Sequence, residues 1–291
     1  MTSRILSGLE VRDHVFTDLT RRVAEARNRP GLAVILVGDD PASAVYVRSK
    51  GKACDQVGYH HVTHLLPAST SESEVLELIA DLNADQDIHG ILIQIPLPPQ
   101  INEARVQQAV DPRKDVDGFH PESLGRLLAG QPSFVPCTPL GVQVMLEYYG
   151  ISVAGRDVAV VGRSVIVGRP LAMLLSRKGS NANATVTLCH SATRNLAEIC
   201  RRADIVVAAM GVPGALSRDH VAEGAVVIDV GINRIGDPTR KKGYRIVGDV
   251  APEAMAGWAS AYSPVPGGVG PMTIAMLLRN TWDAAAALGA L

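Results

Sequence analysis

Residues 162–170 have the composition of a phosphate-binding turn. They begin with Gly162, Arg163 and Ser164, end with Pro170, and follow the apolar stretch 157–161. A buried strand, a glycine turn and a helix with proline in its first turn would present backbone N–H groups at the positive end of a helix dipole. Gly162 and Gly168 are six residues apart, which differs from the usual dinucleotide-binding spacing. The turn predicts a site for a phosphate-bearing cofactor.

Tyr46 and Lys50 are a candidate acid/base pair. They lie four residues apart on a helix predicted over residues 42–57, so they share one helix face. Apolar neighbours could remove water from the lysine, lower its pKa and allow it to move a proton near neutral pH. Tyr46 could then hydrogen-bond the amine and orient it. The alternative interpretation is a solvated lysine beside a half-buried tyrosine.

Further polar residues follow the strands and turns of the same half. Gln94 lies near the end of a predicted strand over residues 90–95, where ligands of open α/β sheets bind. Asp117 stands in a tight turn and suits a partner with paired N–H donors, although it could instead bond its own backbone. Pro264, Gly267 and Gly268 belong to a rigid, glycine-rich loop that could approach a flat ligand closely or merely link two domains.

The end of the second strand of the nucleotide half favours NADP over NAD. NAD-preferring domains place a carboxylate there for the ribose 2′-hydroxyl. This chain has His190, Ser191, Thr193 and Arg194 instead, which would hold a 2′-phosphate. Arg163 in the first turn could assist. Alternatively, Ser191 and Thr193 only cap the following helix.

The composition favours a cytoplasmic enzyme with an aliphatic core. The chain has 291 residues, of which 47% are hydrophobic and 4% aromatic, as in α/β proteins with parallel sheets. A net charge of −1 gives no reason to expect nucleic acid or an anionic membrane as partner. We find no transmembrane stretch and no secretory signal.

Cysteine and histidine spacing gives no support for a metal site. The cysteines stand at positions 54, 137, 189 and 200, without a C-x-x-C pair, and are expected to be buried free thiols. His60, His61 and His64 lie on a predicted strand over residues 59–66, without a nearby carboxylate to complete a metal site.

The order of predicted elements indicates an α/β protein with two domains and a cleft between them. In the N-terminal three-layer catalytic domain, helices are expected over residues 10–29, 42–57 and 72–83, and strands over 32–37, 59–66 and 90–95. Residues 111–139 are expected to be rich in loops. A Rossmann-like domain follows, with strands over 158–161, 185–189, 205–208 and 225–230 and an exposed hairpin over 234–245.

The expected boundaries are residues 1–139 plus 273–291 for the catalytic domain and 140–272 for the NADP-binding domain. A helix bridging the two is predicted over residues 139–149. The terminal helix over residues 275–288 would pack back on the first domain and make it discontinuous.

Several motifs now coincide, and together they resemble one family over nearly the whole chain. It is the bifunctional methylenetetrahydrofolate dehydrogenase/methenyltetrahydrofolate cyclohydrolase family. The matching motifs are residues 46–50, 94–98, 115–119, 162–170 and 264–273. The resemblance implies NADP-dependent oxidation of 5,10-methylenetetrahydrofolate and hydrolysis of the 5,10-methenyl product to 10-formyltetrahydrofolate.

The resemblance also assigns roles to residues. It makes Lys50 the acid/base group, Gln94 its tuning partner, Tyr46 the ring that stacks on the folate and Asp117 the carboxylate that holds the pterin. It assigns NADP binding to Gly162, Arg163, Ser164, Ser191 and Ile232, and a wall between folate and nicotinamide to residues 264–268.

The resemblance further implies a homodimer that packs through the nucleotide domains. Two other functions remain possible at this point: a dehydrogenase without useful cyclohydrolase activity, and a nucleotide-sensing or scaffold protein without catalysis.

Overall fold

The computed structural model describes residues 2–240 and 243–291, except the side chains of residues 42 and 252. The chain divides into two compact units. Unit 1 contains the N-terminal segment through Arg12 and residues 138–273, and unit 2 contains residues 13–137 and 274–291. None of the described helices is long and apolar enough to cross a membrane.

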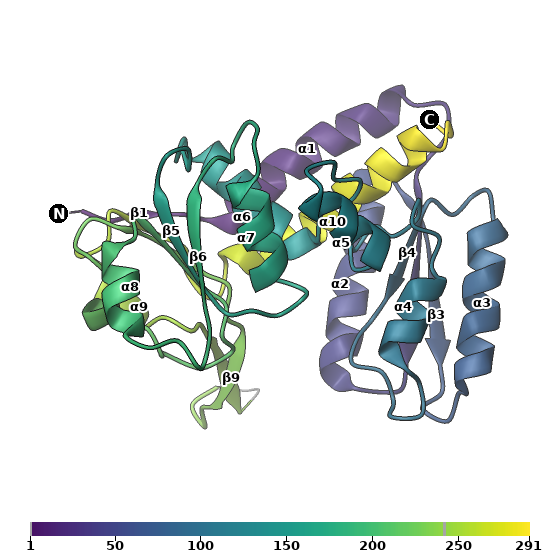
Figure 1. Ribbon diagram of the computed structural model, residues 1–291. Helices are drawn as coiled ribbons and strands as arrows, with labels where there is room; N and C mark the ends of the chain where they lie inside the picture. Colours follow the sequence, from purple (N-terminus) through teal and green to yellow (C-terminus); the bar gives the residue numbers. More distant parts are fainter. Residues whose placement is uncertain (1, 241–242) are drawn as a thin grey trace. The chain divides into compact units, whose positions relative to one another are not determined.

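Figure 1 shows the helices and strands in the order in which they follow along the chain. The helices are α1 (Gly8–Glu25), α2 (Pro41–Val57), α3 (Glu72–Ala84), α4 (Glu103–Ala109), α5 (Pro121–Leu128), α6 (Cys137–Tyr148), α7 (Gly168–Ser176), α8 (Leu196–Arg202), η1 (Arg218–His220, a 3-10 helix), α9 (Pro252–Met255) and α10 (Val269–Ala287). The strands are β1 (Arg4–Ile5), β2 (Gly31–Val37), β3 (His60–Leu66), β4 (Gly90–Ile93), β5 (Asp157–Val161), β6 (Thr185–Cys189), β7 (Ile205–Ala208), β8 (Val226–Asp229), β9 (Asn233–Gly236), β10 (Tyr244–Val247) and β11 (Ala261–Tyr262).

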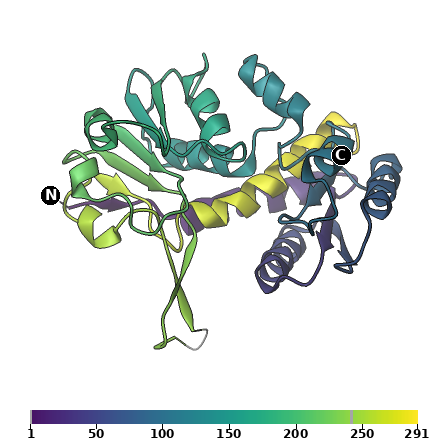
Figure 2. The same ribbon diagram turned by 60° about the horizontal axis from the view of Figure 1, so that its bottom comes forward.

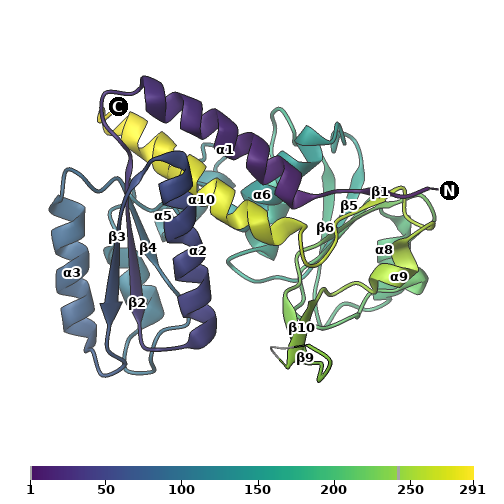
Figure 3. The ribbon, with the colours of Figure 1, turned by 180° about the vertical axis from the view of Figure 1, so that it is seen from behind.

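Unit 2 is built on a parallel sheet with the strand order β3-β2-β4. The central strand β2 is buried along its whole length, which explains its uninterrupted apolar sequence. Apolar side chains of α3 and α4 pack on one face of the sheet, and α2 covers the other face (Figures 1 and 3). The expected α/β layering of this half is confirmed.

The start and end of α2 follow from its sequence. Asp40 Oδ2 accepts a hydrogen bond from Ser43 N at 2.7 Å, and Pro41 occupies the first turn. Gly58, with φ of 86°, ends the helix in the left-handed conformation that glycine adopts without strain. These signals fix the position of Lys50 along the helix.

Unit 1 contains a six-stranded sheet with the order β1-β11-β8-β7-β5-β6, whose paired strands are all parallel. After β6 the chain crosses to the other side of β5 and forms β7. The carboxyl end of β5 is therefore a topological switch point, where open α/β sheets bind ligands. The Rossmann-like prediction is confirmed.

The N-terminal segment differs from the expected domain boundaries. β1 pairs with β11 in the sheet of unit 1, and Gly8 N donates to Gly267 O at 2.8 Å. These residues therefore belong to the nucleotide-binding half, although we expected them in the catalytic domain. A two-residue strand carries too little pattern to reveal its partner in the sequence.

Two helices and one strand end also differ from expectation. α5 lies inside the segment expected to be rich in loops, where His120 Nδ1 accepts from Glu122 N at 3.0 Å and Pro121 stands in its first turn. The short helix α4 was not predicted. β4 ends at Ile93, two residues earlier than expected, so Gln94 follows the strand.

The predicted hairpin is present as the antiparallel pair β9–β10, which projects from the sheet of unit 1 (Figure 2). Residues 241 and 242 of its connection lie outside the described residues.

The carboxylate of Asp249 holds together the carboxyl edge of the unit 1 sheet. It is fully buried and accepts hydrogen bonds from the backbone N–H groups of Met210, Gly211 and Val212 at 2.6, 2.9 and 2.9 Å. It also accepts from Asn233 Nδ2 at 2.9 Å, at the base of the hairpin. One side chain thus fixes the loop after β7 to the start of β9.

We expect Asp249→Asn to lower the free energy of unfolding by about 2–4 kcal/mol, because an amide cannot accept at both ends and leaves buried N–H groups unpaired. Urea unfolding followed by circular dichroism measures the change. The exposed Asp219→Asn is the control and should lie within about 0.5 kcal/mol of the parent. Equal stability of the two variants would contradict this role.

Candidate active site

Lys50 and Gln94 form the polar centre of unit 2. Lys50 Nζ donates to Gln94 Oε1 at 2.9 Å. Gln94 Nε2 donates in turn to Ile95 O at 2.8 Å, which leaves the amide oxygen turned toward the amine. Gln94 N also donates to Ile35 O at 2.9 Å, so the buried strand β2 fixes its backbone. Hydrogen bonds of both its side chain and its backbone therefore set the orientation of Gln94.

The surroundings of Lys50 favour its neutral amine. The residue is half-buried, and burial lowers the pKa of the amine from its ordinary 10.5, although the charge of Asp117 acts in the opposite direction. Burial likewise raises the pKa of Asp117, against the effect of Lys50. The predicted desolvation of the lysine is confirmed.

A rigid turn presents Asp117, and its neighbour Asp115 supports that turn. Asp115 accepts from the backbone N–H groups of Phe119 and His120 at 3.2 and 2.9 Å and from Ser123 Oγ at 2.7 Å. Gly118 has φ of 75°, and a Cβ there would lie 2.6 Å from Pro136 N. The backbone-bonding role considered for Asp117 therefore belongs to Asp115, and Asp117 faces Lys50.

Cys137 and Asn280 complete this group, although the sequence predicts neither as a site residue. Burial raises the pKa of Cys137 well above 9.0, so it remains a thiol, hydrogen-bonded to Asp117 and 3.4 Å from Val116 O. Asn280 Nδ2 donates to Val116 O and Val135 O at 2.8 and 3.1 Å. We had interpreted Cys137 only as a buried thiol, because its distance in sequence from Lys50 conceals their proximity.

Tyr46 lies on the exposed part of α2. Its side chain is 39% exposed, and the described contacts include no hydrogen bond between Tyr46 and Lys50. The idea that Tyr46 orients the amine is wrong, since Gln94 does so. An exposed ring one helical turn from the lysine remains suited to contact a flat ligand.

The turn after β5 in unit 1 explains the unusual glycine spacing. Gly162 has φ of 131°, and a Cβ on it would collide with the carbonyl of Ala209 in the loop after β7. A Cβ on Gly168 would collide with the carbonyl of Gly162. Both glycines are therefore needed for close backbone packing. The residues between them form a wider turn than the common motif.

Ser164 and Arg163 have different roles in this turn. Ser164 Oγ accepts from Val167 N at 3.1 Å and from Gly168 N at 3.5 Å, so the serine closes the turn at the start of α7. The sequence predicts a contact between Ser164 and the cofactor but not this structural role. Arg163 is exposed, and no hydrogen bond or ion pair holds its guanidinium among the residues described. Its charge is available to a phosphate.

The segment after β6 is an exposed turn without a carboxylate. Thr193 Oγ1 accepts from His190 N at 2.8 Å, and His190 Nδ1 accepts from Ala192 N at 3.2 Å. Helix α8 begins only at Leu196, so Thr193 closes the turn and does not cap that helix. Ser191 and Arg194 are exposed. This arrangement can hold the extra phosphate of NADP.

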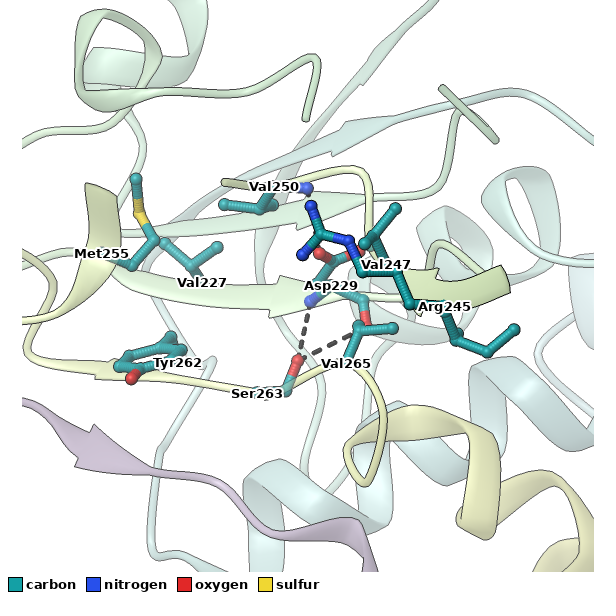
Figure 4. A pocket seen from close by; sticks show the side chains of 11 residues that line it. Val227, Asp229, Arg245, Val247, Val250, Met255, Tyr262, Ser263 and Val265 are labelled. Atoms are coloured by element: carbon teal, nitrogen blue, oxygen red, sulfur yellow. Dashed lines mark hydrogen bonds between the residues drawn. The ribbon is translucent and has the colours of Figure 1, made fainter. Parts of the chain in front are cut away.

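The glycine-rich loop is held against the carboxyl end of β8. Ser263 Oγ accepts from Asp229 N at 2.7 Å, and Ser263 and Val265 line a hollow of about 80 Å³ beside Asp229 (Figure 4). Pro264, Gly267 and Gly268 follow, and a Cβ on Gly268 would lie 2.5 Å from Pro264 O. Ile232 is 47% exposed near this loop. The glycine turn at residues 162–168 does not line this hollow.

Asp229 is a structural carboxylate. It accepts from the backbone N–H groups of Gly231, Asp249 and Val250 at 2.9, 3.0 and 2.9 Å, and burial raises its pKa to about 6. Within the described residues, no group of three or more histidine, cysteine, aspartate or glutamate side chains could hold a metal ion.

Comparisons with known proteins identify the family. Residues 6–117 match the catalytic domain of tetrahydrofolate dehydrogenase/cyclohydrolase, and residues 136–288 match its NAD(P)-binding domain. The chain is 54% identical over 288 residues to bifunctional protein FolD 2 of Geobacter sulfurreducens, covering 98% of each chain.

Comparison with solved structures points to the same family. The bifunctional FolD enzyme of Campylobacter jejuni is 43% identical with a TM-score of 0.92, covering 98% of this chain and 99% of that one. The Trypanosoma brucei FolD enzyme, solved with NADP cofactor and an inhibitor, is 37% identical with a TM-score of 0.93, covering 99% of this chain and 98% of that one. The resemblance inferred from the sequence is confirmed: this chain belongs to the tetrahydrofolate dehydrogenase/cyclohydrolase family.

Proposed function

We propose that this protein oxidises 5,10-methylenetetrahydrofolate with NADP+ and hydrolyses the 5,10-methenyl product to 10-formyltetrahydrofolate. The observation that carries the proposal is the desolvated Lys50 amine, bonded to Gln94 and facing Asp117. Dehydrogenase and cyclohydrolase activities are both named for the family and for the Campylobacter jejuni and Trypanosoma brucei enzymes described above. A scaffold or sensor without catalysis would not need a buried lysine with a lowered pKa.

The residues of unit 1 fit a phosphate-bearing dinucleotide. The glycine turn lies at the switch point of the sheet, at the start of α7, where the positive end of the helix dipole favours an anion. Arg163, His190 and Ser191 supply positive charge and donors without an opposing carboxylate. When bound, NADP+ supplies the hydride acceptor. We expect Gly162, Ser164 and Ile232 to contact it as well.

In the hydrolytic step, Lys50 acts as the proton acceptor. As a water oxygen bonds to the methenyl carbon, one water proton passes to the neutral Lys50 amine. The resulting ammonium returns a proton to N5 while the bond from the carbon to N5 breaks, and the hydroxyl proton leaves to solvent as the formyl C=O forms. The cationic substrate itself lowers the pKa of Lys50 and keeps the amine neutral before attack.

The other residues of unit 2 position the folate. Asp117 accepts from the N–H donors of the pterin edge, and its raised pKa allows it to share a proton with that edge. Tyr46 offers an exposed ring on which a flat ring system can stack. In unit 1, Pro264, Gly267 and Gly268 supply a narrow, rigid wall.

We also propose that the enzyme is a cytoplasmic homodimer without nucleic acid or membrane as partner. The free cysteines among the described residues suit a reducing compartment. The nearly neutral net charge suits a small-molecule enzyme.

We expect Lys50→Met to slow methenyltetrahydrofolate hydrolysis by about 100-fold or more, because the proton acceptor is lost. With methylenetetrahydrofolate and NADP+, NADPH should still form while the methenyl absorbance persists. The matched control is Lys52→Met, an exposed lysine on the same helix, which should hydrolyse at the parental rate. Parental hydrolysis by Lys50→Met would refute the assignment. A parent protein that forms no NADPH would refute the dehydrogenase activity.

We expect Gln94→Glu to move the pH dependence of hydrolysis upward by about one unit or more. Hydrolysis requires the neutral amine, so it rises as the pH passes through the pKa of Lys50. A carboxylate in place of the amide at 2.9 Å raises that pKa and therefore the midpoint. Rates across a pH series measure the shift, with the exposed Gln108→Glu as control. An unchanged midpoint would count against tuning by Gln94.

We expect Arg163→Ala to raise the KM for NADP+ about tenfold and to leave the KM for NAD+ nearly unchanged, because the arginine contacts only the 2′-phosphate. Parallel titrations with both nucleotides measure the two constants. Arg202→Ala, an exposed arginine on α8, is the control. Equal losses with both nucleotides would place Arg163 elsewhere on the cofactor.

A further inference from the structure

Unit 2 has a polar hollow at the edge of its sheet where the parallel strands begin. The hollow has a volume of about 480 Å³, and its lining includes Arg27, Arg29, His60, Asp87 and His89. It shares no residue with the group around Lys50. A volume of this size lies in the range of small-molecule sites.

Strand register brings these residues together. β2 begins at Gly31, two residues after Arg29, and pairs Gly31 with His60 at the start of β3. β2 also pairs Leu32 with Gly90 at the start of β4, directly after His89. His60 N donates to Pro30 O at 3.0 Å, and His89 N donates to Gly31 O at 2.8 Å. Main-chain bonds thus fix both histidines at this edge.

His89 has an unused donor at this edge. Its side chain is only 4% exposed, and its Nδ1 accepts from Gly31 N at 2.9 Å. The proton of the neutral ring must therefore be on Nε2. That nitrogen is buried and has no hydrogen-bond partner among the residues described. Buried donors are nearly always paired, so this one calls for an acceptor.

Arg27 and Arg29 are also unpaired. Both are exposed, and neither guanidinium forms a hydrogen bond or an ion pair within the described part of the chain. In contrast, Arg105 and Arg113 of the same unit each bond a carboxylate, at 2.8 and 2.6 Å. Asp87 is the only acidic side chain in the lining described, so positive charge predominates.

We infer that this hollow binds a phosphate group, taken either from free inorganic phosphate or from a small phosphate monoester. A tetrahedral phosphate offers several acceptor oxygens. The guanidinium groups of Arg27 and Arg29 can bind two of them in the forked geometry that arginine favours. A third oxygen would give the N–H of His89 its missing acceptor. The remaining space beside His60 and Asn28 accommodates the organic part of a monoester.

This site is separate from the catalytic lysine. β4 runs from Gly90 to Ile93, with His89 before it and Gln94 after it. Five residues of extended strand span about 16 Å, so a phosphate at His89 cannot touch Lys50 or its ligand. The inference therefore does not depend on the proposed catalytic function.

Histidine ring NMR tests the site directly. The full-length protein, labelled with 15N at its eight histidines, is saturated with NADP+ so that the nucleotide turn is filled. It is then titrated with inorganic phosphate, with glycerol 2-phosphate and with glycerol, at constant ionic strength. The His60 and His89 signals, assigned with His60→Gln and His89→Gln, should shift saturably with the two phosphates and not with glycerol. The His190 signal should not shift.

Charge variants provide the second measurement, and calorimetry gives the affinities. We expect Arg27→Gln/Arg29→Gln to weaken phosphate binding about tenfold or more, because charge-assisted bonds are lost. The control Lys178→Gln/Arg202→Gln removes the same charge from exposed positions in unit 1 and should bind like the parent.

Tighter binding of glycerol 2-phosphate than of phosphate would identify a monoester site. Equal or weaker binding would identify a free phosphate site. The inference is overturned if neither phosphate shifts His60 and His89 saturably, or if the Arg27/Arg29 variant binds as tightly as its control.

Discussion

The hydrogen bond from Lys50 to Gln94 is the interaction on which the catalytic half depends. An amine moved out of water loses solvation, and it stays in place only if a neighbouring group replaces part of that solvation without restoring the full charge. The amide of Gln94 does this, since it accepts a hydrogen bond and carries no charge. A carboxylate at the same distance would hold the lysine as ammonium. The charge of Asp117 opposes this lowering of the pKa of Lys50.

The surrounding structure maintains this balance. Asp115 secures the turn that carries Asp117, Asn280 of α10 holds the carbonyl groups on either side of that turn, and Cys137 provides a neutral donor. In unit 1, the two glycines of the turn after β5 permit a backbone packing that any side chain would prevent. The buried carboxylates of Asp229 and Asp249 fix the neighbouring loops. Each half therefore uses fully bonded carboxylates as supports and leaves other polar groups available for ligands.

The unit 2 sheet offers polar groups at both ends of its parallel strands. Gln94 and Lys50 lie at the carboxyl ends, and His89 with two arginines lies at the amino ends. Buried strands carry no polar side chains between these ends, so the strand core insulates the two sites while fixing the position of each. The unpaired donor of His89 distinguishes the second site from an ordinary exposed basic surface.

The sequence by itself determined the α/β class, most helices and strands, and the candidate site residues around Lys50 and Gly162. These features are encoded locally: apolar runs define the buried strands, Asp40 and Pro41 define the start of α2, and the motifs around Lys50, Gln94 and Gly162 lie in short segments. The resemblance already implied the pairing of Lys50 with Gln94, which the hydrogen bond between the two side chains bears out. Tertiary structure alone decided the other contacts. It left Tyr46 without a bond to the amine among the described residues and assigned the supporting role in the turn to Asp115 rather than Asp117. It also brought Cys137 and Asn280 to the site, placed β1 in the sheet of unit 1 and left the Nε2 atom of His89 without a partner among the described residues. These outcomes depend on strand register and on contacts between distant segments, which a single sequence does not specify.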